Sequence, residues 1–233
     1  MILCIHQPSY FPWLGLLDKI AKCDVYMVMD EVQLTDDAFQ HRNLFLTVDG
    51  EKKYLTIPLN KKDYLHRPFK DLEIADQTWN EKHLNFIKNN YRKHPFYKDI
   101  IPAVEEILSR KYEKLIDIVV ASMRLSFTWF NISTKVIFQS EMAYDRTLRK
   151  GELVIALIKA AGADCYLSGI GAQAYLDESE FGRDIKLLYN HFSHPIYKQH
   201  STAAFIPGLA CLDAIFNIGI EGSRGLVSQG RTA

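Results

Sequence analysis

The stretch MILCIHQPSYFPWLGLLDKIAKCDVYMVMDEVQ, residues 1–33, decides the fold of this chain. Residues 1–5 form an apolar run that ends at the polar side chain of His6, a pattern typical of a buried strand that opens into a loop. Residues 12–23 then place apolar side chains at helical spacing, and residues 25–29 form a second apolar run. The pattern predicts a strand, a helix and a second strand. A right-handed crossover of this kind makes the two strands parallel.

A β-hairpin and a set of helices are predicted next. The runs 43–48 and 53–59 flank Asp49-Gly50, a dipeptide that favours a hairpin turn. From residue 76 to about residue 131 the apolar spacing becomes helical. We expect one of these helices to start at Pro102, because proline is favoured in the first helical turn. This region is predicted to be a helical insertion or cap that packs against the sheet.

The alternation of strands and helices resumes after the insertion. Strands are expected over 133–138, 164–168 and 186–192, and helices over 148–161 and 209–218. The chain is therefore predicted to be α/β in class, with a mainly parallel, Rossmann-like sheet, a β-hairpin and a helical insertion over about 76–131. Residues 1–233 are expected to form a single domain.

The composition is that of a soluble globular protein, with 48% apolar and 24% charged residues. The 28 basic residues balance the 28 acidic ones, which excludes the broad positive field of non-specific DNA binding. The N-terminus has neither the basic start nor the apolar length of a signal peptide, and no apolar run reaches the ~20 residues that cross a bilayer. We expect a cytoplasmic protein without a membrane span.

Neither the cysteines nor the histidine cluster indicates a metal site. The four cysteines are widely spaced, form no C-x-x-C pair and are expected to be buried, reduced thiols. They are Cys4, Cys23, Cys165 and Cys211. Three histidines, His191, His194 and His200, lie within ten residues, but their spacing fits no single helical face and Pro195 separates them. Polar loop positions are the better interpretation, so no metal site is predicted.

Polar side chains follow the predicted strands, and the carboxyl ends of parallel strands are where α/β proteins bind ligands. His6 is followed by a helix, so a ligand phosphate could meet both its imidazole and the free amides of the helix start. The alternative is a histidine that hydrogen-bonds a neighbouring loop. Gln7 and Tyr10 favour a binding role for this segment.

The second strand ends at an acidic pair, Asp30 and Glu31, with Gln33 close by. These side chains could hold Mg²⁺, orient a substrate amine or act as a general base. Carboxylates after a strand are also common turn and cap formers, and that alternative stays open for each of them.

Anion-binding groups are predicted further along the chain. Arg42 is a candidate because guanidinium binds phosphate or carboxylate through two hydrogen bonds, with a solvated arginine as the alternative. Ser168 and Gly169 open a small-residue loop through which backbone amides can approach a phosphate. Tyr175 and Asp177 follow in a short predicted helix and are further candidates for substrate binding. The loop matches neither the dinucleotide fingerprint nor the P-loop.

The opening stretch IHQPSYFPWLGLLDKIAKCDVYMVMDEVQ closely resembles the start of the WbqC-like protein family. Further blocks of similarity are FQHRN (39–43), LTIPL (55–59), YLSGIGAQAYLDE (166–178) and FIPGLACLDAIFNIG (205–219). The resemblance therefore spans nearly the whole chain. The last block departs from the family pattern at Ala210-Cys211, where a serine is expected, and this puts in doubt a polar role at that position.

The resemblance implies an enzyme of bacterial surface polysaccharide biosynthesis, such as that of the O-antigen of lipopolysaccharide. Such an N-acyltransferase or ATP-dependent ligase forms an amide on the amine of a nucleotide-linked amino sugar, with glycine or another acyl or aminoacyl unit. In this scheme His6 is the base or a phosphate ligand, and Asp30 and Glu31 orient the amine or Mg²⁺. Arg42 and the Ser168 loop hold phosphate.

Several alternatives stay open at this point. ATP and Mg²⁺ are possible cofactors, while a thioester or an aminoacyl-tRNA would serve equally as donor. A non-catalytic nucleotide-sugar binding protein and a glycosyltransferase with a metal-binding acidic pair are the competing functions. The oligomeric state is not predicted.

These candidate residues are expected to lie together in space. A parallel sheet gathers its strand ends along one edge, so one pocket is expected to be lined by His6, Gln7, Asp30, Arg42 and Ser168.

Overall fold

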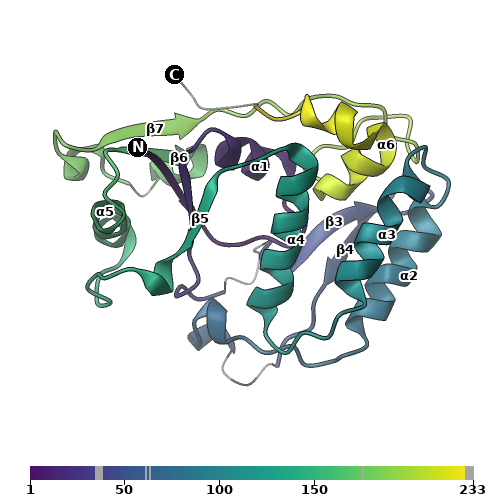
Figure 1. Ribbon diagram of the computed structural model, residues 1–233, viewed down its shortest axis with the longest axis horizontal. Coiled ribbons are helices and arrows are strands. Elements are labelled where there is room, and N and C mark those ends of the chain that lie inside the picture. Colours follow the sequence, from purple (N-terminus) through teal and green to yellow (C-terminus); the bar gives the residue numbers. More distant parts are fainter. Residues whose placement is uncertain (35–38, 61, 63, 175, 229–233) are drawn as a thin grey trace.

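The computed structural model describes residues 1–34, 39–60, 62, 64–174 and 176–228 (Figure 1). Its strands are β1 (Ile2–His6), β2 (Val25–Val28), β3 (Arg42–Leu46), β4 (Lys52–Thr56), β5 (Lys135–Phe138), β6 (Cys165–Gly169) and β7 (Lys186–Asn190). Its α-helices are α1 (Leu14–Ala21), α2 (Trp79–Tyr91), α3 (Tyr97–Leu108), α4 (Leu115–Phe130), α5 (Lys150–Ala160) and α6 (Cys211–Arg224). Short 3₁₀ helices are η1 (Tyr64–His66), η2 (Phe69–Asp71), η3 (Gln139–Glu141), η4 (Ile170–Ala174) and η5 (Glu178–Phe181).

Five strands form one parallel sheet in the order β5-β2-β1-β6-β7. β1 lies at its centre, where Leu3 is in register with Val25 of β2 and with Tyr166 of β6. Counted along the chain, these strands follow the Rossmann order 3-2-1-4-5, and the direction of winding reverses between β1 and β6. The predicted α/β class with a mainly parallel, Rossmann-like sheet is confirmed, as is the parallel pairing of the first two strands.

Helices cover both faces of the sheet, so the side chains of β1 alternate between two cores (Figure 1). Cys4 lies in the core shared with α1 and α4, whereas Leu3 and Ile5 lie in the core shared with α5. On the first face, Phe127 of α4 packs edge-on against Tyr26 of β2, with ring centres 6.4 Å apart. α4 therefore acts as the helix of the β2-to-β5 crossover.

The predicted hairpin is confirmed, but it is not hydrogen-bonded to the main sheet. β3 and β4 form a separate antiparallel pair. Their turn needs Gly50 for two reasons: its φ of +80° is left-handed, and a Cβ there would lie 2.6 Å from the carbonyl oxygen of Ser201. The hairpin, α2 and α3 thus precede α4 within one long connection between neighbouring strands.

The start expected at Pro102 is wrong, because α3 begins at Tyr97 and contains the proline. The missing amide of Pro102 costs one helical hydrogen bond. The same helix buries Ile100, Ile101 and Val104. Their packing against the core stabilises the helix on both sides of the proline. Tertiary contacts here override a local start signal.

The last helix is longer than the predicted range of 209–218. α6 continues to Arg224 through a kink at Gly219, whose φ is +73°. A Cβ at Gly219 would lie 2.7 Å from the ring of Phe96, so only glycine lets the chain turn against that aromatic side chain.

Three further observations concern the cysteines, the metal-ligand side chains and the length of the helices. The four cysteines are free, and three of them are buried while Cys165 is half-buried. No group of three His, Cys, Asp or Glu side chains in the described residues could hold a metal ion. No helix in the described part of the chain combines the length and apolar character that a bilayer crossing requires.

His94, just after α2, is a buried histidine without a polar partner. Its ring packs against Tyr91, with centres 4.7 Å apart, and neither ring nitrogen has a hydrogen-bond partner among the described residues. Burial and the neighbouring His200 lower the pKa of His94 to about 4. An unfolded histidine binds a proton below a pH of about 6.5. The stability present above that pH is therefore lost as the pH falls toward 4.

We predict that His94→Phe will increase the free energy of unfolding by about 2 kcal/mol more at pH 5 than at pH 7. The phenyl ring fills the same space and has no proton to take up in the unfolded state. Urea denaturation at both pH values checks this, with exposed His191→Phe as control. Equal effects of His94→Phe at both pH values would contradict it.

Candidate functional site

A cavity of about 760 Å³ lies beyond the carboxyl ends of β1 and β2, on the face of the sheet that α5 covers. This is the crevice beside the reversal of winding, where open α/β sheets bind ligands. Its polar lining comes from the ends of β1 and β2, from the segment after β5 and from the start of α5. These residues are His6, Gln7, Glu31, Gln33, His66, Gln139, Tyr144, Arg146, Arg149 and Lys150.

His6 ends β1, and its imidazole has a defined tautomer. Nδ1 lies 2.8 Å from the carbonyl oxygen of Gln7, which can only accept, so Nδ1 carries the proton and Nε2 keeps a lone pair. Nε2 has no hydrogen-bond partner among the described residues. Solvent reaches the ring, but the surrounding protein atoms and the charge of Lys19 lower the pKa of His6. At neutral pH the ring is therefore neutral, and Nε2 can accept a hydrogen bond from a ligand.

Gln7 is held in place by two other glutamines. Its Nε2 donates to the carbonyl oxygen of Gln33 at 3.2 Å, and its Oε1 accepts from Nε2 of Gln40. Gln33 in turn lies 3.5 Å from the carbonyl oxygen of His66. One amide hydrogen of Gln7 is left for a ligand, so the binding role predicted for Gln7 and Gln33 has a suitable geometry.

Glu31 is the centre of a charged cluster. Its Oε1 accepts from Lys70 Nζ at 2.8 Å, and its Oε2 accepts from the Tyr144 hydroxyl at 2.8 Å and from Arg146 Nε at 3.2 Å. The side chain is 12% exposed. Burial opposes the charge, but the bonds from Lys70 and Tyr144 and the charge of Arg146 prevail and lower the pKa of Glu31. These contacts favour a positioning role over that of a proton acceptor.

Three cations at this cavity were not among the predicted site residues. Arg146, Arg149 and Lys150 precede or begin α5, and all three are exposed. The amides of the first helical turn have no partner within the helix and, together with the helix dipole, favour an anion. Lys150 also has a φ of +52°, an uncommon conformation that is frequent at functional sites. The sequence signal was three cations within five residues, at the start of the helix predicted over 148–161.

Asp30 does not face the cavity that His6 and Glu31 line. Its carboxylate accepts from the backbone amide of Ser140 at 2.9 Å and from the Ser140 hydroxyl at 2.6 Å, and the residue is 3% exposed. It lines a second cavity and is not part of the lining that contains His6. The catalytic roles of Asp30 and Glu31 stay predictions, but the two carboxylates do not form one acidic pair.

Tyr10 and Arg42 lie outside this cavity. Tyr10 is buried, and its hydroxyl lies 3.1 Å from Nδ1 of His83 in the core. Arg42 begins the hairpin, and its guanidinium stacks on the ring of Tyr54 at 4.6 Å. The expectation that Arg42 lines the pocket of His6 is wrong, because the hairpin forms its own sheet and keeps this side chain on it.

Ser168 and Gly169 belong to the end of β6 and not to a loop, and neither they nor residues 170–174 line the cavity. Ser168 is buried, and neither it nor Gly169 is part of the lining, although Tyr166 of the same strand is. Asp177 accepts from the amide and hydroxyl of Ser179 and caps η5, as turn-forming carboxylates do. Tyr175 lies outside the described residues. Substrate binding by these residues stays a prediction, but a shared pocket for His6 and Ser168 is not found.

Comparison with known proteins gives a family and one distant relative. The model of a family described as the WbqC-like protein family matches residues 7–224. A protein of Mycobacterium tuberculosis (strain ATCC 25618 / H37Rv), named uncharacterized protein Rv1507c, is 26% identical over 222 residues, which cover 94% of each chain. No solved structure matches the chain significantly.

We predict that Glu31→Gln will lower the free energy of unfolding by about 1–2 kcal/mol at pH 7, because Lys70 and Arg146 lose their shared counter-ion. Glu73→Gln is the matched control, since the pair of Glu73 with Arg67 is at the surface and contributes less than about 0.5 kcal/mol. Because the pKa of Glu31 is lowered, the difference from wild type should shrink as the pH falls below about 4.3. Urea denaturation across this pH range measures it, and equal effects of the two substitutions would contradict it.

Proposed function

The chain belongs to the WbqC-like protein family, and we propose on that basis that it is an enzyme that forms an amide on the amine of a nucleotide-linked amino sugar. The acyl or aminoacyl unit is added to a sugar for bacterial surface polysaccharide, such as the O-antigen. The observation that supports this most is the cavity beyond β1 and β2, which combines a neutral histidine with three cations at a helix start.

The cations provide a place for the diphosphate of the nucleotide sugar. Arg146 is held by Glu31, whereas Arg149 is bonded only to backbone carbonyl oxygens, those of Arg146 and Leu148, at 2.7 Å. Neither Arg149 nor Lys150 forms an ion pair with a carboxylate among the described residues, although Arg149 interacts electrostatically with the exposed Asp145. A diphosphate beside them gains charge-assisted hydrogen bonds and the first amides of α5.

His6 is suited to assist the attacking amine. Nε2 accepts a hydrogen bond from the amine, which directs the nitrogen lone pair toward the acyl carbon. As the C–N bond forms, the nitrogen becomes acidic and its proton passes to Nε2, while the leaving group departs from the acyl carbon. Gln7 lies next to this ring and offers its remaining amide hydrogen to the substrate.

The glycosyltransferase alternative is less well supported by the geometry. It would use Asp30 and Glu31 together as metal ligands, but their carboxylates lie at different cavities and accept from Ser140, Lys70 and Tyr144. ATP with Mg²⁺ stays a candidate for activation of the acyl group. Its phosphates would meet the same cations as those of the nucleotide sugar.

The direct test is mass spectrometry of the purified protein with UDP-linked amino sugars, ATP, Mg²⁺ and candidate acids, glycine included. We expect an amide product whose mass exceeds that of the sugar nucleotide by one acyl unit. His6→Ala should lower kcat about 100-fold or more while the affinity for the sugar nucleotide changes little. Release of free UDP instead of an amide product would indicate glycosyl transfer, and binding without turnover would indicate a binding protein.

We predict separately that Arg149→Gln combined with Lys150→Gln will raise the Kd of a UDP-linked amino sugar at least tenfold, because two diphosphate contacts are lost. The loss should shrink at high salt, where such contacts are screened. Arg183→Gln, an exposed arginine outside the cavity lining, is the control. Isothermal titration at two salt concentrations measures both effects, and an unchanged Kd in the double variant would remove the cations from the site.

A further inference from the structure

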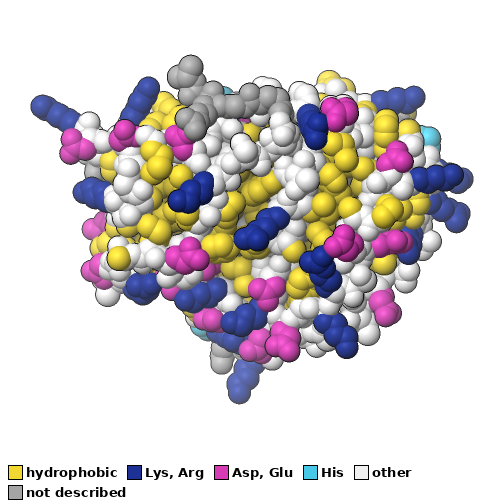
Figure 2. Space-filling model, viewed as in Figure 1, with side chains coloured by type: hydrophobic (Ala, Val, Ile, Leu, Met, Phe, Trp, Pro, Cys, Tyr) yellow, Lys and Arg dark blue, Asp and Glu magenta, His cyan; other side chains and the backbone are white. Residues whose placement is uncertain are grey.

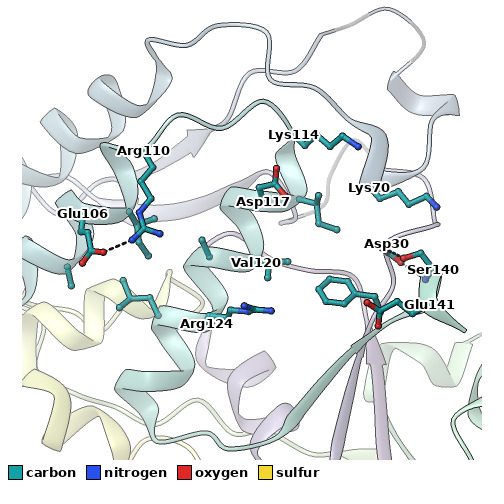
Figure 3. A pocket seen from close by; sticks show the side chains of 16 residues that line it. Asp30, Lys70, Glu106, Arg110, Lys114, Asp117, Val120, Arg124, Ser140 and Glu141 are labelled. Atoms are coloured by element: carbon teal, nitrogen blue, oxygen red, sulfur yellow. Dashed lines mark hydrogen bonds and ion pairs between the residues drawn. The ribbon is translucent and has the colours of Figure 1, made fainter.

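A second cavity, of about 780 Å³, lies between the helices α3 and α4 and the carboxyl ends of β2 and β5 (Figure 3). Its floor is apolar and includes Ile107, Val120, Leu125 and Phe138. Figure 2 shows the same face of the molecule, where hydrophobic side chains extend across a hollowed surface and basic side chains lie over them. The volume is in the range of pockets that bind small organic molecules.

Four of the eight charged groups that line this cavity have partners among the described residues. Arg110 pairs with Glu106 at 2.5 Å, and Asp30 accepts from Ser140 (Figure 3). Arg124 is different: its guanidinium has no hydrogen bond or ion pair among the described residues, and in Figure 3 it lies at the apolar floor beside Val120. The Arg124 side chain is exposed, and a cation beside an apolar surface favours a ligand that carries an anionic group on an apolar body.

The other charged side chains of the lining help to decide between a phosphate and a carboxylate as the anionic group of the ligand. Lys114 is a second cation at the rim, whereas Asp117 and Glu141 are acids of the same lining. The whole lining holds four acids and four cations, so it lacks the excess positive charge that a phosphate with several charges needs, whereas a carboxylate with one charge can pair with Arg124 alone. A monocarboxylic acid therefore fits this cavity better than a nucleotide.

The two cavities share a wall that is built from consecutive residues. Asp30 lines the second cavity and Glu31 the first. Glu31 connects them directly, because its Oε1 accepts from Lys70 of the second cavity and its Oε2 from Arg146 of the first. Groups bound in the two cavities are thus separated by one row of side chains at the strand ends.

We propose that the second cavity is a separate binding site for a carboxylic acid with an apolar body, with its carboxylate at Arg124 and its apolar part on the floor that includes Val120 and Leu125. The row of side chains between the cavities keeps this acid out of contact with an amine at His6, so this proposal does not depend on the proposed function. Glycine has no apolar side chain to cover the floor, whereas a longer acid does. Each methylene group that is fully buried tightens binding about fourfold.

The test is NMR titration of the full chain with acetate, glycine, butyrate and hexanoate. We expect hexanoate to bind at least tenfold more tightly than acetate or glycine. Arg124→Gln should weaken hexanoate binding at least tenfold, and Val120→Thr, which keeps the volume but adds a hydroxyl, should weaken it several-fold. Arg92→Gln, an exposed arginine elsewhere on the helical region, is the matched control and should change nothing.

The results that overturn the proposal are specific. Glycine binding as tightly as hexanoate would exclude recognition of an apolar body by this cavity, and hexanoate binding that survives Arg124→Gln would place the acid elsewhere. A dimer that Arg124→Glu dissociates, measured by light scattering, would show that the groove is an interface between copies of the chain. The proposed function is tested independently, since Arg149→Gln should weaken the UDP-linked sugar and leave hexanoate unaffected. Loss of only one ligand identifies which of the two proposals fails.

Discussion

The central position of β1, hydrogen-bonded to β2 on one side and to β6 on the other, is the constraint on which the candidate site depends. Because all strands are parallel, each connection must return along a face of the sheet, and the connections through α1 and α5 use opposite faces. The connections therefore diverge at the carboxyl end of β1, where a cavity opens. His6 lies there because it is the last residue of this strand, and its register opposite Val28 brings the end of β2 beside it.

The sequence predicted what depends on local pattern and strand direction. The apolar runs gave β1 and β2 correctly, the Asp49-Gly50 turn gave the hairpin, and the end of β1 gave His6 its place in a cavity. The failures concern side-chain direction and tertiary packing. Consecutive carboxylates were treated as one pair, but the strand end turns Asp30 and Glu31 toward different cavities. Arg42 was assigned by its nearness to a predicted strand, and periodicity cannot show that this strand belongs to a separate sheet.

The charge of the cavity that His6 lines depends on which of its cations are paired with a carboxylate. Glu31 is mostly buried, and its charge is stable only because Lys70, Tyr144 and Arg146 all donate to it. It neutralises the cations that it contacts, whereas Arg149 and Lys150 form no ion pair with a carboxylate among the described residues, and the exposed Asp145 acts on Arg149 only through its charge. The chain has no net charge overall, so this local excess of positive charge is a property of the fold. A ligand with two negative charges can pair with both Arg149 and Lys150.

This division of charge also affects the basicity of His6. In the free protein, burial among protein atoms and the charge of Lys19 lower its pKa, so the imidazole is neutral and is not itself an additional cation. A diphosphate bound beside the ring adds negative charge, and we expect this to raise the pKa of His6 toward its usual value. The ring would thus become a stronger base only when the nucleotide sugar is in place. Since Nδ1 stays bonded to the carbonyl oxygen of Gln7, the proton taken up must go to Nε2, the nitrogen that the substrate amine can reach.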